Sequence, residues 1–120
     1  MIINKRYNGK CGEDKAKEYL IGIGYLLIEE NWQNRYGEID LIMLDRGEVV
    51  FVEVRTKNSS KYGTALESVN KKKQLQIVKM VSTFLQNKNW WDKRYRIDVI
   101  AIDKKDDSYN LAHIKNAVEI

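Results

Sequence analysis

The chain has 120 residues and a mass of 14.1 kDa, which predicts one domain, residues 1–120, with a single hydrophobic core. One cysteine excludes an internal disulfide and a cysteine-ligated metal cluster. No apolar run is long enough to span a membrane, and no signal-peptide pattern opens the chain. The cytoplasm is therefore the expected compartment. The 21 Lys and Arg exceed the 17 Asp and Glu, and the net charge of +4 permits nucleic-acid binding without requiring it.

The first half of the chain predicts a helix followed by strands. After a polar and basic lead-in at residues 1–10, apolar residues at three- and four-residue steps indicate a helix from residue 11 that ends at Gly22 and Gly24. Residues 25–32 are expected to form a strand and residues 31–36 a polar connection. Strands at 38–44 and 49–57 follow, and residues 58–63 are expected to form a loop.

The second half predicts another helix and one or two more strands. Residues 69–86 have an amphipathic pattern whose apolar stripe includes Leu75, with Asn70 or Ser68 as the N-cap. Residues 87–92 are expected to form a half-buried loop that contains Trp90 and Trp91. A strand at 95–102 and a short strand near 109–114 complete the chain. The order helix, three strands, helix, one or two strands predicts an α/β fold, a mixed sheet flanked by helices.

The strands at 38–44 and 49–57 form a hairpin that carries charged groups in an apolar setting. Gly47 supplies the positive φ that the turn at residues 45–47 needs. Alternation puts Glu53 and Arg55 on one face, and hairpin register can place Asp40 beside Glu53 across the ladder. Two adjacent carboxylates repel each other and are costly to desolvate, and a divalent cation would remove both penalties. We therefore predict a metal site at Asp40 and Glu53.

Phosphodiester hydrolysis is a chemistry that suits this arrangement. Mg²⁺ or Mn²⁺ held by one or two carboxylates keeps positions for water and a phosphate. Glu13, early in the first helix, is a candidate third acid that only the fold can bring close. Arg55 and Lys57 are candidates to contact the scissile phosphate and offset its developing charge.

A basic patch near the second helix points independently to an anion. Three lysines occupy the first turn of that helix, where the helix dipole disfavours cations by roughly 0.3–1 kcal/mol each. Such a cluster is easier to understand if a phosphate docks there. The candidate nucleic-acid contacts are Lys57, Lys61, Tyr62, Lys71, Lys72, Lys73 and Gln74.

Several motifs together resemble a known family. They are GE at Glu13, GEIDLI around Asp40, VFVEVRTK around Glu53, the strand RIDVIAI and the ending HIKNAV. In these motifs the chain resembles the YraN-like family of small uncharacterised bacterial proteins. That family is similar to the Holliday junction resolvases and to the restriction-endonuclease-like superfamily, whose signature is Asp, then Glu or Asp, any residue, Lys.

The resemblance implies a restriction-endonuclease-like fold and a magnesium-dependent endodeoxyribonuclease. It implies that Asp40 and Glu53 bind the metal, together with the backbone carbonyl of Val54. Glu13 matches an acid of the first helix, and Gln74 matches a glutamine of the following helix. By analogy with resolvases, it also implies a homodimer that acts on DNA, including branched DNA.

The sequence departs from the superfamily pattern at two positions. Ile39 stands where proline is frequent, and Arg55 stands where the active-site lysine is expected. An arginine stays protonated, so it cannot act as a general base, although it can bind a phosphate bidentately. Lys57, on the same strand face as Arg55, is a candidate replacement.

Other interpretations of the same residues stay open. The chain can be an enzyme, a non-catalytic module that binds branched or single-stranded DNA, or an interaction protein in which the charged residues are a structural ion cluster. Glu38 is on the same strand face as Asp40 and is a candidate supporting acid, but an exposed residue at a strand end is the favoured interpretation. Asp98 is expected to be structural, as a partner of Arg96 or as a neighbour of the acids, and His113 to have no metal or base role. The choice of DNA or RNA is not indicated.

Overall fold

The computed structural model describes residues 2–6, 12–58 and 64–119. The strands are β1 (Ile2–Arg6), β2 (Leu26–Asn34), β3 (Gly37–Asp45), β4 (Glu48–Asn58), β5 (Tyr95–Lys105) and β6 (Ser108–Ile114). The helices are α1 (Gly12–Gly22) and α2 (Lys71–Lys88), with a 3₁₀ turn, η1 (Leu66–Ser68), between β4 and α2. The predicted α/β order is confirmed, and the short final strand is present as β6. None of the described helices is both long and apolar enough to cross a membrane.

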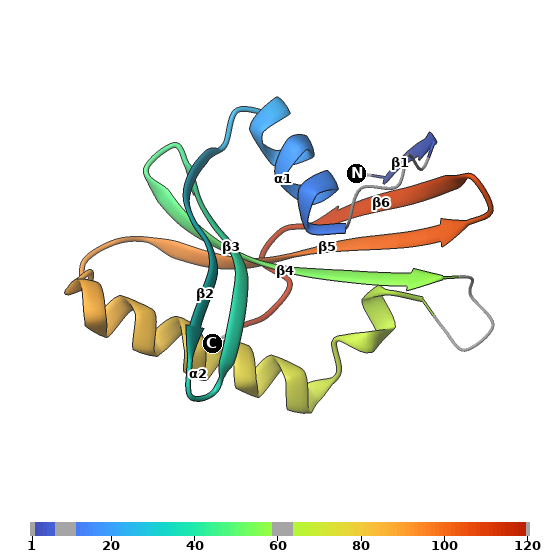
Figure 1. Ribbon diagram of the computed structural model, residues 1–120. Helices are drawn as coiled ribbons and strands as arrows, with labels where there is room; N and C mark the ends of the chain where they lie inside the picture. The colour runs from blue at the N-terminus through green and yellow to red at the C-terminus, as the bar shows by residue number, and fades with distance from the viewer. Residues whose placement is uncertain (1, 7–11, 59–63, 120) are drawn as a thin grey trace.

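The strands form one mixed sheet in the order β1-β6-β5-β4-β3-β2. Among the described strands, β4 and β5 are the one parallel pair. Helix α2 lies in the connection between them, since parallel neighbours cannot be joined by a tight turn. Helices α1 and α2 cover opposite faces of the sheet (Figure 1). Strand β1, which pairs antiparallel with β6, lies in the segment that the sequence indicated only as a polar lead-in.

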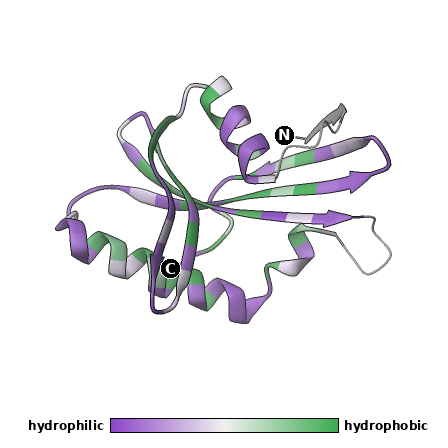
Figure 2. Cartoon of the chain, viewed as in Figure 1, coloured by the Kyte–Doolittle hydropathy of each residue, from purple (hydrophilic) through white to green (hydrophobic). Residues whose placement is uncertain are grey.

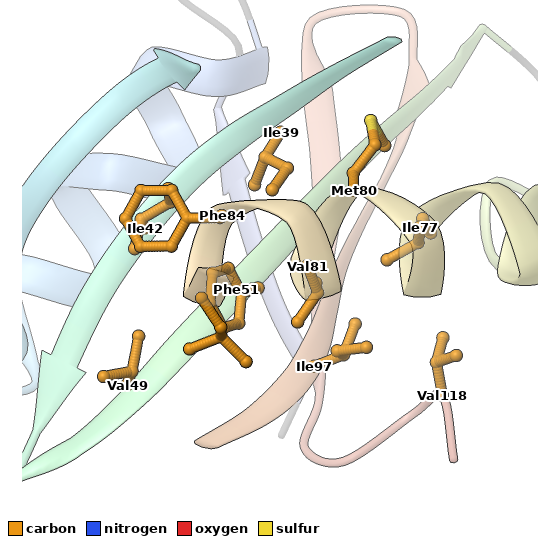
Figure 3. Close-up of a cluster of buried hydrophobic side chains, with 11 residues drawn as sticks. Ile39, Ile42, Val49, Phe51, Ile77, Met80, Val81, Phe84, Ile97 and Val118 are labelled. Carbon is orange, nitrogen blue, oxygen red and sulfur yellow. The ribbon is translucent and has the colours of Figure 1, made fainter. Parts of the chain in front are cut away.

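A hydrophobic core lies on each face of the central strands. Figure 3 shows side chains of α2 lying over those of the strands on the α2 face. The buried members of this cluster are Ile39, Ile42, Val49, Phe51, Ile77, Met80, Val81, Phe84, Leu85, Ile97 and Val118. The cluster on the α1 face contains Ala16, Leu20, Tyr25, Leu41, Met43, Val50, Val52, Ile100, Ile102 and Leu111. Strands covered on both faces need nearly continuous apolar runs, and the middle of the sheet is accordingly hydrophobic (Figure 2).

Short-range signals explain where several elements begin and end. Arg46 and Gly47 both have positive φ, 52° and 83°, which matches the primed turn that suits a tight hairpin. Of the two N-caps considered for α2, the structure uses Asn70, whose Oδ1 accepts a hydrogen bond from the Lys73 backbone at 2.9 Å. Helix α2 ends at Lys88, two residues beyond the predicted end, and Asn89 takes the left-handed conformation after it.

Three sequence expectations about local structure were wrong. Strand β2 continues to Asn34, because residues 32–34 pair with β3, so the expected polar connection shrinks to a tight turn. Leu75, assigned to the buried stripe of α2, is 56% exposed because it lies on the side of the helix turned away from the sheet core. Trp90 packs on the core as expected, but Trp91 is 69% exposed.

The turn between β2 and β3 packs tightly against α2. Gly37 has a φ of 146°, and a Cβ there would lie 2.7 Å from Gln76 Nε2 and 3.2 Å from Met80 Sδ. The side chain of Gln76 also donates a hydrogen bond to the backbone carbonyl of Tyr36. Glycine at this position therefore allows the turn to approach the helix closely enough to be held by it.

A polar network lies on the α1 face, away from the hairpin acids. Asp98 is completely buried and accepts hydrogen bonds from Arg96 Nε at 2.9 Å and from the Asn116 backbone at 3.0 Å. Its Oδ2 lies 2.7 Å from His113 Nε2. Burial alone raises the pKa of the Asp98 carboxyl, but the contacts with His113 and Arg96 bring it below its usual value. Of the two positions considered for Asp98, a partner of Arg96 or a neighbour of the acids, the structure shows the first.

We expect Gly37→Ala to lower the free energy of unfolding by about 1–3 kcal/mol, because the new methyl group overlaps Gln76 and its backbone is strained. Gly24→Ala is the matched control. Its φ is also positive, 100°, but no atom of the described residues lies within 4 Å of the added Cβ. Urea unfolding of both variants separates packing from backbone strain, and equal losses would show that the contact with α2 contributes little.

We expect Asp98→Asn to lower the free energy of unfolding by about 3 kcal/mol at neutral pH, because it leaves Arg96 with a weakened buried partner. Because the pKa of Asp98 is lower in the folded chain than its ordinary value of 3.8, its ionised carboxylate stabilises the fold above that value. This stabilisation is lost as the pH falls through the pKa of Asp98 in the folded chain. The deficit of the variant should therefore narrow below about pH 4. Asp45→Asn, which removes a partly exposed partner of the same arginine, is the control in urea titrations at several pH values.

Candidate active site

Strands β3 and β4 stop pairing at the position of the two hairpin acids. The ladder runs from Asp45 opposite Glu48 to Leu41 opposite Val52, so the next residues along each strand are Asp40 and Glu53. Here the backbone amide of Val54 donates to Asp40 Oδ2 at 2.8 Å, in place of a ladder carbonyl. A side-chain carboxylate thus bridges the two strands where their backbones separate.

Both hairpin acids are in surroundings that disfavour their charged forms. Burial raises the pKa of the Asp40 carboxyl, and the hydrogen bond from the Val54 amide offsets only part of that shift. Glu53 is only 5% exposed. Burial first, and the negative charge of Asp40 second, raise the pKa of Glu53 to about 7, although the ammonium of Lys73 opposes this shift. The repulsion expected from the sequence between Asp40 and Glu53 is therefore a property of the folded chain.

A third acid, Glu13, approaches Asp40 from α1, and a fourth, Glu38, lies two residues before it on β3. Carboxylate oxygens of Glu13, Glu38 and Asp40 all lie within 4.8 Å of one another. Burial raises the pKa of the Glu13 carboxyl, and the charges of Asp40 and Glu38 raise it further. Glu13 lies in the first turn of α1, on one face of the sheet, and reaches Asp40 where β3 and β4 separate.

Glu38 was expected at an exposed strand end, with a supporting place beside Asp40 as the alternative. It is half-buried, and its carboxylate lies close to those of Glu13 and Asp40. Its two-residue spacing from Asp40 was the available signal, because such residues share a strand face. With its amide nitrogen turned toward the acids, Asn31 donates to Glu13 at 2.6 Å and to Glu38 at 3.0 Å. Gln33 Nε2 also donates to Glu38, at 2.8 Å.

Two cations contact Glu53 from the α2 side of the site. Lys73 Nζ lies 3.3 Å and Arg55 Nη1 3.4 Å from the same oxygen, Oε2. Arg55 is held in place by its Nε, which donates to Ser68 Oγ at 2.8 Å. Lys73, predicted from its place in the lysine cluster, therefore brings an ammonium group to the acids. The sequence pattern would have placed a lysine at the position of Arg55.

The other predicted site residues occupy several different places. Lys57 lies on β4 beyond Arg55, and in the described part of the chain no hydrogen bond or ion pair joins it to Asp40 or Glu53. Gln74 donates to the backbone carbonyl of Val69 at 3.1 Å, a contact that supports the start of α2. Lys71 and Lys72 are exposed in the first turn of that helix, while Lys61 and Tyr62 lie outside the described residues.

A cavity of about 580 Å³ lies beside the acids. Arg55 and Lys73 line this cavity and also contact Glu53, so these two side chains connect the cavity with the acids. Its other walls come from the turn before β3, from η1 and from α2. Among the described residues that line the cavity there are four cations and no carboxylate.

Comparison with known proteins agrees with the motifs found in the sequence. Residues 12–102 match the model of the uncharacterised protein family UPF0102. A UPF0102 protein of Persephonella marina is 44% identical over 112 residues, 93% of each chain, and one of Stutzerimonas stutzeri is 42% identical over 113 residues, 93% of this chain and 94% of that one. A UPF0102 protein of a Sulfurihydrogenibium species is 36% identical over 118 residues, 98% of this chain and 99% of its own. The expected family is thereby confirmed: the chain belongs to the uncharacterised protein family UPF0102.

Proposed function

We propose that this chain is a metal-dependent endonuclease that hydrolyses phosphodiester bonds in DNA. The observation that carries the proposal is the position of Asp40 and Glu53. They are neighbouring acids, Glu53 buried and Asp40 partly buried, both with raised pKa, at the point where β3 and β4 separate. Such a pair is costly unless a cation or a proton compensates it. The acids of α1 and β3 on one side, and the cations of β4 and α2 on the other, surround this point.

The donor groups fit a hard divalent cation. Mg²⁺ and Mn²⁺ prefer carboxylate oxygens, and oxygens of Glu13, Glu38 and Asp40 already lie within 4.8 Å of one another. Asp40 and Glu53, with Glu13 and Glu38 assisting, are the residues that would hold the ion. When bound, such an ion polarises the phosphate and lowers the pKa of a bound water.

The remaining residues of the site position the acids and offset charge. The Val54 amide fixes Asp40, and Asn31 and Gln33 orient Glu38. Arg55 and Lys73 stabilise the negative charge that develops on the phosphate. In this proposal Lys73, rather than Lys57, supplies the amine that the family pattern places on β4, because its ammonium already contacts Glu53.

DNA is supported as the substrate by the basic surface next to the acids. Lys71, Lys72 and Lys73 start α2, and cations alone provide the charges on the described lining of the neighbouring cavity. A polyanionic backbone is the partner that such a surface attracts. Branched DNA and a homodimer are part of the proposal only through the resemblance to the resolvases.

A non-catalytic module that binds nucleic acid is the alternative, and one observation favours it. Lys73 and Arg55 both contact the same oxygen of Glu53, so protein cations already compensate part of its charge. A site balanced in this way needs no metal for stability. Such a module would bind DNA equally well in the presence of a chelator and would cleave it with no divalent metal.

We expect Asp40→Asn to reduce Mn²⁺- or Mg²⁺-dependent DNA cleavage by about 100-fold or more, the scale of losing one electrostatic group at a reacting centre. Asp92→Asn, the same change at an exposed loop residue, is the control and should cleave like the wild type. The assay is a gel time course on branched and linear DNA with and without chelator. Unchanged cleavage in the Asp40 variant would refute the site, and DNA binding without any cleavage by the wild type would favour the module.

We expect Glu53→Gln to raise the free energy of unfolding above neutral pH by at least about 1 kcal/mol when metal is absent. A raised folded pKa gives stability that is complete below the ordinary value of 4.5 and lost as pH rises through about 7. Glutamine does not ionise, so the Glu53 variant keeps this stability. Its free energy of unfolding should therefore exceed that of the wild type by the full amount at pH 8 and by nothing near pH 4.5.

Thermal unfolding in chelator at both pH values measures this difference, and calorimetry with Mn²⁺ should show weakened binding by the Glu53 variant. Glu119→Gln, at an exposed position near the end of the chain, is the matched control. A Glu53 variant that is less stable than the wild type at pH 8, or that binds Mn²⁺ normally, would contradict the assignment.

A further inference from the structure

The cavity beside the acids has features that hydrolysis of a phosphodiester does not require. Its volume of about 580 Å³ lies within the ordinary range of small-ligand sites. Tyr36, from the turn between β2 and β3, forms part of its wall, and Leu75 and Lys79 of α2 form another part. Neither Tyr36 nor Leu75 has a part in the chemistry proposed for the acids.

The charge of the cavity changes little along its length. Arg55 and Lys73 line the part that adjoins Glu53. Lys72, in the same first turn of α2, and Lys79, further along the helix, also line it. Lys72 and Lys79 are seven residues apart, so they lie on one side of the helix, two turns from each other. A chain of phosphates that continues from the acids would therefore meet cations along the cavity.

Tyr36 provides an aromatic ring that is fixed in place but still accessible. Its side chain is 38% exposed, and its backbone amide donates to Asn34 Oδ1 at 2.8 Å. The close approach of Gly37 to Gln76 holds the same turn against α2. Arg35 contacts the Tyr36 hydroxyl at 3.1 Å, and Lys79 Nζ lies 5.9 Å from the ring centroid. A ring positioned in this way loses little freedom when a ligand stacks on it.

Leu75 completes an apolar surface among the cations. It is 56% exposed, although it is flanked along α2 by lysine and glutamine residues. A flat aromatic ring and an aliphatic side chain, surrounded by ammonium groups, match the parts of a nucleotide, which joins a flat base to a phosphate. Paired bases inside a duplex present only their edges, so an apolar wall of this kind is useful only to a base that has left the stack.

We infer that this cavity receives one unpaired nucleotide of DNA next to the bond that the acids cleave. The base lies against Tyr36 and Leu75, and its phosphate contacts Lys72 and Lys79. The inference rests on the proposed function for the position of the cleaved bond. It adds a substrate class: DNA with an unpaired nucleotide beside the cleavage point, as in a bulge, a gap or a junction, is preferred to continuous duplex.

The first test compares binding of two oligonucleotides by fluorescence anisotropy in chelator at fixed salt. One is a continuous duplex, and the other is the same duplex with a single unpaired nucleotide. We expect the wild type to bind the duplex with the unpaired nucleotide about tenfold more tightly, which corresponds to the binding free energy of one base–aromatic stack. Tyr36→Ala should lose that preference and bind the continuous duplex within about twofold of the wild type, whereas Tyr36→Phe should keep it.

Trp91→Ala is the matched control, because Trp91 is 69% exposed and lies beyond the other end of α2. Its removal should change neither affinity. Direct contact is tested by placing 5-iododeoxyuridine at the unpaired position and irradiating the complex. The cross-linked peptide should contain Tyr36, and thermal unfolding confirms that each variant is folded.

The outcomes separate this inference from the proposed function. If Tyr36→Ala weakens both oligonucleotides equally, or the cross-link falls elsewhere, the nucleotide cavity is refuted, while metal-dependent cleavage by the wild type would keep the endonuclease. If the preference depends on Tyr36 but the wild type cleaves no DNA with any divalent metal, the cavity is supported and the endonuclease is refuted. A wild type that binds neither oligonucleotide overturns both.

Discussion

The hydrogen bond from the Val54 amide to the Asp40 carboxylate is the contact on which the arrangement of the site depends. It lies where the ladder between β3 and β4 ends, and it satisfies an amide that would otherwise lack its partner across the ladder. Because the strands separate there, groups from both faces of the sheet reach the same point. Glu13 comes from the α1 side and Lys73 from the α2 side. An uninterrupted ladder would have kept these two helices apart.

The electrostatics of the site follow from that opening. Burial raises the pKa of both carboxyls, Asp40 and Glu53, because neither charged form is solvated well. The charge of Asp40 raises the pKa of Glu53 further, whereas the Val54 amide and the contact with Glu53 lower that of Asp40 in part. Lys73 and Arg55 compensate Glu53, whereas Asn31 contacts only Glu13 and Glu38 through its amide. The cations therefore contact the acids through Glu53, while carboxylate oxygens of Glu13, Glu38 and Asp40 lie within 4.8 Å of one another.

Helix α2 links the acids to the cavity. Its first turn carries Lys73 to Glu53, and Asn70 caps that turn, so the position of the ammonium is set by the start of the helix. Further along, Gln76 holds the turn that carries Tyr36. The face of α2 turned to the sheet builds a hydrophobic core (Figure 3), and its neighbouring face lines the cavity. Packing of one helix thus fixes both the charge at the acids and the shape of the cavity.

The sequence by itself determined the element order from α1 to β6, the hairpin and the pair of acids within it. The alternation of side chains along each strand and the glycine of the turn are local signals, so the sequence alone could place Asp40 beside Glu53. The motifs around them were also sufficient to indicate the family. Glu13, Lys73 and Tyr36 belong to segments far from these acids in sequence, and only tertiary packing brings them together. Periodicity describes which face of an element is apolar, but it carries no information on where two elements meet. The acids are therefore a product of local pattern, and the site around them is a product of the fold.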